Sequence, residues 1–161
     1  SVALVLCLLV AGVSANVSAV NPETILADQD DVRALDWINE HLPKDARFFI
    51  NTTPWGYGIY RGVDGGAWIL PYTGRWAIVP TIFYPFGVKT YDYTAELGEN
   101  AHRVDTCDDK LWDIVKEANI QYLYLKQDSG VMNINQSDDC QRLSGIYSVG
   151  KVSIWLILSM D

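Results

Sequence analysis

The chain has 161 residues, of which 49% are hydrophobic and 20% are charged, a composition typical of a globular protein with one buried core. Twelve Lys and Arg against 20 Asp and Glu give a formal net charge of −8, and the basic residues form no cluster longer than a pair. We therefore expect no nucleic-acid partner, because nucleic-acid binding depends on neutralising phosphates.

The N-terminal segment is the least polar part of the chain. Residues 1–22 carry no charge, and residues 2–13 are almost wholly apolar. The run is shorter than the about 20 residues that a spanning helix needs, so three interpretations stay open: the end of a transmembrane helix, a clipped signal peptide that ends at a small-residue pattern, or a buried core helix. The first two place the rest of the chain outside the cytoplasm.

This pattern predicts three parts. Residues 1–20 are the end of a transmembrane helix, or a clipped signal peptide, together with the start of a stalk. Residues 21–29 are a linker, where Asn21-Pro22 interrupts any helix. Residues 30–161 are an extracytoplasmic domain that residues 1–20 attach to the membrane.

The three cysteines fit this location. Cys7 lies in the apolar run, where it is a small hydrophobic residue. Cys107 and Cys140 lie in polar surroundings without the spacing of a zinc site, and in an oxidising compartment such a pair forms a disulfide. We predict this bond, with two unrelated surface thiols as the alternative.

The first part of the domain predicts a helix and a strand. Asp30 and Asp31 are suited to capping a helix that runs to about Leu42, and Pro43 ends it. Its expected apolar stripe consists of Val32, Leu35, Ile38 and Leu42. Residues 46–51 are short, rich in β-forming residues and bounded by prolines, which indicates a buried strand.

Residues 54–93 contain 11 of the 19 aromatic residues and are rich in glycine and proline. We expect no regular structure there except a strand near residues 76–82, and we expect His102 to lie in a polar loop.

The C-terminal part predicts a second helix, a strand and a hairpin. The helix starts at Asp108 and Asp109 and ends at Asn119 in a left-handed turn. Residues 120–125 form a strand, and residues 145–148 and 152–158 form a terminal hairpin. The fold class is therefore α/β: a mixed sheet with two main helices, a long aromatic and Gly-rich loop region and a C-terminal β-hairpin.

Familiar catalytic and cofactor motifs are missing from the sequence. The glycines around Gly56-Tyr57-Gly58 do not have dinucleotide-fingerprint spacing, the two histidines are far apart, and no serine has a nucleophile-elbow setting. We expect no catalytic residue, no metal site and no cofactor.

A candidate binding segment remains, between residues 61 and 75. Its flat aromatic faces suit a sugar ring, a carboxylate suits sugar hydroxyls, and guanidinium groups suit a phosphate. Contact with a bilayer and simple core packing are the alternatives. The expected substrate-binding residues are Arg61, Asp64, Gly65, Gly66, Trp68 and Arg75, and we expect Asp64, Trp68 and Arg75 to line one exposed concavity.

Four stretches carry a resemblance to a known family: DWINEHLPKDARF at residues 36–48, DGGAW at 64–68, LPYTGR at 70–75 and GKVSIW at 150–155. Together they resemble the C-terminal soluble region of prokaryotic multi-span membrane proteins that are grouped with the dolichyl-phosphate-mannose-dependent type of glycosyltransferase, the C superfamily. The similarity covers roughly residues 1–158, including a last membrane helix.

The resemblance implies a function. Members of the superfamily take a sugar from a polyprenyl-phosphate carrier on the extracytoplasmic face, with the catalytic acid in an early membrane loop, so no catalytic residue is carried over to this chain. The leading hypothesis is a non-catalytic extracytoplasmic accessory domain of a membrane glycosyltransferase-like protein, which contacts a lipid-linked sugar or a carbohydrate acceptor and is inactive by itself. The alternatives are a binding or scaffolding domain of a membrane protein without transferase activity, and a secreted lectin-like domain.

Overall fold

The computed structural model describes residues 2, 3, 5, 27–80, 84–86, 91–134 and 140–158. Most of the expected membrane segment and linker, with Cys7, lies outside these residues, so the division at residues 20 and 29 stays a prediction. Within the described part of the chain, no helix is long and apolar enough to cross a membrane.

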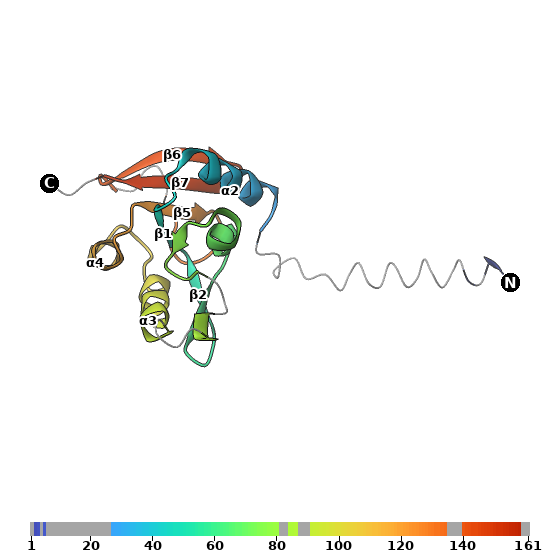
Figure 1. Ribbon diagram of the computed structural model, residues 1–161, viewed down its shortest axis with the longest axis horizontal. Helices are drawn as coiled ribbons and strands as arrows, with labels where there is room; N and C mark the ends of the chain where they lie inside the picture. Colours follow the sequence, from blue (N-terminus) through green and yellow to red (C-terminus); the bar gives the residue numbers. More distant parts are fainter. Residues whose placement is uncertain are drawn as a thin grey trace.

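A mixed five-stranded sheet organises the domain (Figure 1), and the predicted α/β class is confirmed. The strands lie in the order β4-β1-β5-β7-β6, with β4, β1 and β5 parallel and β5, β7 and β6 antiparallel. A second, two-stranded sheet is the antiparallel pair β2–β3. The strand bounds are β1 Arg47–Ile50, β2 Thr52–Gly56, β3 Ile59–Gly62, β4 Trp76–Ala77, β5 Tyr122–Lys126, β6 Leu143–Val149 and β7 Val152–Ile157.

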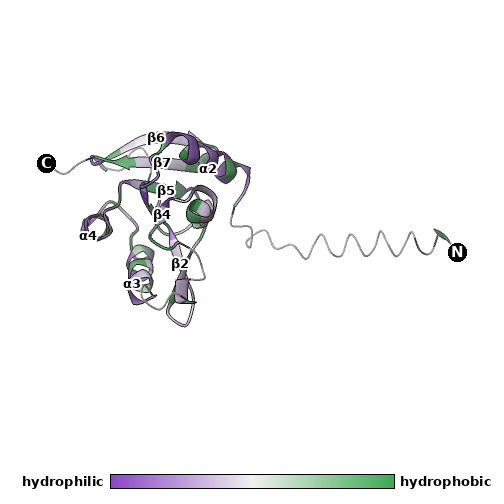
Figure 2. Ribbon diagram, viewed as in Figure 1, coloured by the Kyte–Doolittle hydropathy of each residue, from purple (hydrophilic) through white to green (hydrophobic). Residues whose placement is uncertain are grey.

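Helices α2, α3 and α4 pack around these strands. Helix α2 contacts β6 and β7, whereas α3 contacts β2, β3 and α4. Figure 2 shows hydrophobic residues on β5, β7 and part of α2, which agrees with a core between these elements. The bounds are α2 Gln29–His41, α3 Tyr91–His102 and α4 Asp109–Ala118, with short helical turns η2 Gly65–Trp68, η3 Ile69–Thr73 and η4 Tyr84–Phe86.

Helix α2 is confirmed, but its cap is a different residue from the one expected. Asp28, rather than Asp30 or Asp31, is the N-cap, and its side chain accepts hydrogen bonds from the backbone N–H groups of Asp30 and Asp31. The Asp31 carboxylate accepts from Asp28 N in return, which completes a capping box. Val32 is 45% exposed, so it does not belong to the buried stripe that Leu35 and Ile38 form.

The second predicted helix and the disulfide are both confirmed. Asp108 caps α4, and Asn119 ends it in the left-handed conformation with φ 51°. Cys107 and Cys140 are bonded, with a Cα–Cα distance of 5.7 Å. The bond therefore ties the N-terminal end of α4 to the segment before β6.

The region 54–93 contains more regular structure than expected. It holds the β2–β3 hairpin and the start of α3, and the strand expected at residues 76–82 is only Trp76–Ala77. Gly98 lies inside α3 because the helix packs closely on β3: a Cβ at this position would lie 2.6 Å from Cβ of Tyr60. His102 ends α3 instead of lying in a loop, and its Nδ1–H donates to the carbonyl of Thr52 at 3.0 Å.

Candidate functional site

A buried polar network joins the start of α2 to the end of β5. Asp31 and Tyr124 are fully buried, and the Tyr124 hydroxyl donates to Asp31 Oδ1 at 2.6 Å. Lys126 Nζ donates to Asp31 Oδ2 at 2.5 Å and to Asp28 Oδ2 at 2.8 Å. Tyr124 and Lys126 are two residues apart on a strand, so both side chains lie on the face that α2 covers.

The start of η2 is a third segment that contacts this network. Gly65 N donates to Asp31 Oδ1 at 3.2 Å. A Cβ at Gly65 would lie 2.3 Å from that same oxygen, and a Cβ at Gly66 would lie 2.8 Å from Cγ2 of Ile50. Both glycines, which the sequence suggested for ligand binding, are therefore required for close packing of the backbone.

Asp64 lies beside the network with one carboxylate oxygen unsatisfied. Its Oδ1 accepts from Gly66 N at 2.9 Å, and among the described residues no group hydrogen-bonds its buried Oδ2. Burial raises the pKa of Asp64 to about 7; the hydrogen bond from Gly66 opposes this shift, and the charge of Asp31 adds to it.

The neighbouring groups titrate in ways that preserve the network. The hydrogen bond from Lys126 holds the pKa of Asp28 at about 2. Burial opposes the charged form of Lys126, but hydrogen bonds to Asp28 and Asp31 outweigh it and raise the Lys126 pKa. Burial, followed by the charges of Asp64 and Asp31, raises the pKa of Tyr124, so its hydroxyl remains a donor. Within this network, Lys126 is the counter-ion of both Asp28 and Asp31.

Arg75 has a structural role at the opposite end of α2. Its guanidinium donates to the backbone carbonyls of Leu42 at 2.8 Å, Thr73 at 2.7 Å and Asn39 at 3.1 Å, and to the Asn39 side chain at 2.7 Å. The bonds to Asn39 and Leu42 satisfy carbonyls that the C-terminal end of α2 leaves without partners.

The prediction that Asp64, Trp68 and Arg75 line one exposed concavity is wrong. Asp64 and Arg75 each expose only 1% of their surface, and they lie at opposite ends of α2, whereas Trp68 is 48% exposed. The sequence pattern missed this because both residues are buried against a helix far away in sequence: Gly65, next to Asp64, donates to Asp31, and Arg75 donates to Asn39.

Arg61 lies in a different setting from the other candidates. Its guanidinium carbon is 4.6 Å above the ring of Trp55, which lies across the β2–β3 hairpin, and its buried Nε has no hydrogen-bond partner among the described residues. A substrate-binding role for Arg61, Asp64, Gly65, Gly66, Trp68 and Arg75 stays a prediction.

The part of the chain that the structure describes contains no group of three or more His, Cys, Asp or Glu side chains arranged to hold a metal ion.

Sequence reasoning missed the network of Asp31, Tyr124 and Lys126. The two signals that could have found it are the capping-box spacing of Asp28 and Asp31 and the two-residue spacing of Tyr124 and Lys126 on a strand.

The chain matches no family model and no curated protein. Among solved structures it is similar to the C-terminal globular domain of oligosaccharyltransferase from Archaeoglobus fulgidus, with 13% sequence identity and a TM-score of 0.47. The similarity covers 81% of this chain and 97% of the other. So distant a likeness carries no conclusion about function.

Proposed function

We propose that this domain is a non-catalytic extracytoplasmic accessory domain of a membrane glycosyltransferase-like protein, held at the membrane by its N-terminal segment. The transferase context comes from the resemblance of residues 36–48, 64–68, 70–75 and 150–155 to the soluble region of such proteins.

The observation that carries the non-catalytic role is the burial of Asp64 and Arg75 inside the fold. A general acid or base must come within hydrogen-bond reach of the proton it transfers. Asp64 is 1% exposed, and Arg75 is equally buried while its guanidinium caps α2. Two of the three charged groups in the candidate segment, Asp64 and Arg75, are thus withdrawn from solvent, and the third, Arg61, is half-buried over the ring of Trp55.

The disulfide between Cys107 and Cys140 supports the extracytoplasmic location, since such bonds persist in oxidising compartments. The proposal includes contact between this domain and a lipid-linked sugar or a carbohydrate acceptor.

The test uses the purified 161-residue chain and the full-length membrane protein, each incubated with lipid-linked sugar donors and acceptors. We expect no transfer by the chain alone, and we expect transfer by the full-length protein to fall when residues 30–161 are deleted. Turnover by the isolated chain would overturn the proposal. Full activity of the deleted protein would instead favour a binding or scaffolding domain with no part in transfer.

A further inference from the structure

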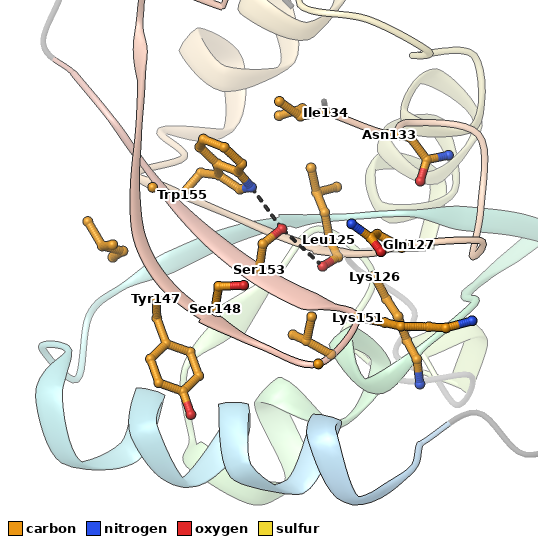
Figure 3. A pocket seen from close by; sticks show the side chains of 14 residues that line it. Leu125, Lys126, Gln127, Asn133, Ile134, Tyr147, Ser148, Lys151, Ser153 and Trp155 are labelled. Atoms are coloured by element: carbon orange, nitrogen blue, oxygen red, sulfur yellow. Dashed lines mark hydrogen bonds between the residues drawn. The ribbon is translucent and has the colours of Figure 1, made fainter. Parts of the chain in front are cut away.

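We infer that a cavity between the C-terminal hairpin and the segment after β5 binds a neutral saccharide. The cavity has a volume of about 520 Å³. Figure 3 shows Trp155 and Ser153 on the sheet side of this space and Asn133 and Ile134 on the side of the connecting segment. The residues that carry the inference are Gln127, Asn133, Gly145, Ser148, Ser153 and Trp155.

Trp155 provides a flat apolar surface at the cavity. It pairs with Gly145 on the neighbouring strand, and a Cβ at Gly145 would lie 3.3 Å from the six-membered ring of the indole. The indole therefore lies against the bare backbone of β6, where a Cβ would make a tight contact with the ring. The half-buried ring has the flat, extended surface on which the C–H face of a sugar ring packs.

A chain of hydrogen bonds fixes the orientation of this ring. Trp155 Nε1 donates to Ser153 Oγ at 2.9 Å, and Ser153 Oγ donates to the carbonyl of Leu125 at 3.4 Å (Figure 3). The polar atom of the indole is thus already satisfied within the protein. Its apolar face is left as the part of the side chain available to a ligand.

The rest of the lining offers uncharged hydrogen-bonding groups. Gln127, Asn133 and Ser148 line the cavity, and their side chains form no hydrogen bond with any other described residue. Each amide has donors and an acceptor, and the hydroxyl has both functions. Neighbouring hydroxyls of a sugar have the same mixed character, so this set matches a polyol better than an apolar ligand.

The charges near the cavity are already paired. Lys126 is bound to Asp28 and Asp31 on the opposite face of the sheet, and Lys151 forms an ion pair with Asp128 at 2.8 Å. In Figure 3 both lysine side chains extend away from Trp155. Among the described lining residues, both lysines are thus engaged with carboxylates, which favours a neutral sugar over a sugar phosphate.

This inference deepens the proposed function and rests on it for the source of the sugar, namely the glycan that the transferase handles. It places recognition at the hairpin, away from Asp64 and Arg75. The two claims are tested separately, because sugar binding is measured on this chain and the accessory role on transfer by the full-length protein.

The test is two-dimensional ¹H–¹⁵N NMR of the full 161-residue chain in detergent micelles. The probes are the methyl glycosides of glucose, mannose, galactose and N-acetylglucosamine, with glucose 1-phosphate as the charged comparison. We expect at least one neutral glycoside to shift the indole N–H of Trp155 and the side-chain amides of Gln127 and Asn133, with no tighter binding of the phosphate.

Variants assign the binding to the cavity. Trp155→Ala and Asn133→Ala should each weaken the affinity about tenfold or more. Asn133 is not part of the core, so its variant keeps the test valid if Trp155→Ala does not fold. Trp68→Ala, which removes a half-exposed indole outside the cavity, should bind as the unmodified chain does. The inference is overturned if no probe shifts the cavity signals, if the shifts map to the β2–β3 hairpin, or if Asn133→Ala binds normally.

Discussion

The hydroxyl of Tyr124 donates a hydrogen bond of 2.6 Å to the carboxylate of Asp31, a residue 93 positions earlier in the chain. This contact joins the middle of the sheet to the first turn of α2. Lys126 and Gly65 bind the same carboxylate, so one buried side chain connects three segments of the fold.

Replacing Tyr124 by Phe should lower the free energy of unfolding by about 1–3 kcal/mol, because a buried carboxylate loses a donor that nothing replaces. Urea denaturation followed by circular dichroism measures the change. Tyr72→Phe is the matched control, since Tyr72 also donates to an aspartate, Asp36, at 2.6 Å but at the surface. Equal effects of the two substitutions would contradict a special role for the buried contact.

Lys126→Met should destabilise the domain by about 3 kcal/mol, because Asp31 would remain buried without its counter-ion. Lys126 exposes only 11% of its side chain and Asp31 none. Lys151→Met, which breaks the exposed pair with Asp128, should change the free energy of unfolding by about 1 kcal/mol or less. A Lys126 variant as stable as the Lys151 variant would show that the buried pair contributes little.

The stability should fall as the pH rises from about 4 to about 7. The pKa of Asp64 is about 7 in the folded chain and near its ordinary value of 3.8 when unfolded, so the folded state binds the proton more tightly in this window. The stability that Asp64 contributes is fully present below its pKa in the unfolded chain. It is lost as the pH rises through the pKa of Asp64 in the folded chain. The low pKa of Asp28 acts in the opposite direction, but only between about pH 4 and pH 2.

Asp64→Asn should flatten that slope, because the amide does not titrate. The measurement is the free energy of unfolding at a series of pH values, with Asp45→Asn, an exposed aspartate, as the control that keeps the slope. An unchanged slope in Asp64→Asn would mean that another group titrates in this window.

Removing the disulfide should cost about 3–4 kcal/mol, because the bond closes a loop between residues 33 positions apart. The double variant Cys107→Ser, Cys140→Ser tests this by thermal or urea unfolding. A reducing agent should lower the stability of the unmodified chain to a similar level and leave the double variant unchanged. Equal stability of oxidised and reduced chain would contradict the prediction.

The elements predicted correctly are those whose signals are local. Asp108 and Asn119 mark the two ends of α4, and Gly150, with φ 53°, lies in the turn of the hairpin. Helix α3 was not predicted. Its close packing on β3, where a Cβ at Gly98 would collide with Tyr60, is a long-range contact that the local sequence does not show.

The site was harder to predict than the fold. Asp64 and Arg75 look like ligand-binding residues in the sequence because both lie among glycines and aromatics. Their burial depends on Asp31 and on the end of α2, and these long-range contacts leave no periodic pattern within residues 61–75.

Under the proposed function, the domain supports transfer without supplying catalytic groups. The most direct measurement is the rate of sugar transfer by the full-length membrane protein carrying Asp64→Asn, compared with the unmodified protein and with the protein that lacks residues 30–161. We expect a near-normal kcat for Asp64→Asn and a loss of transfer on deletion. A folded Asp64→Asn protein that has lost turnover would contradict it.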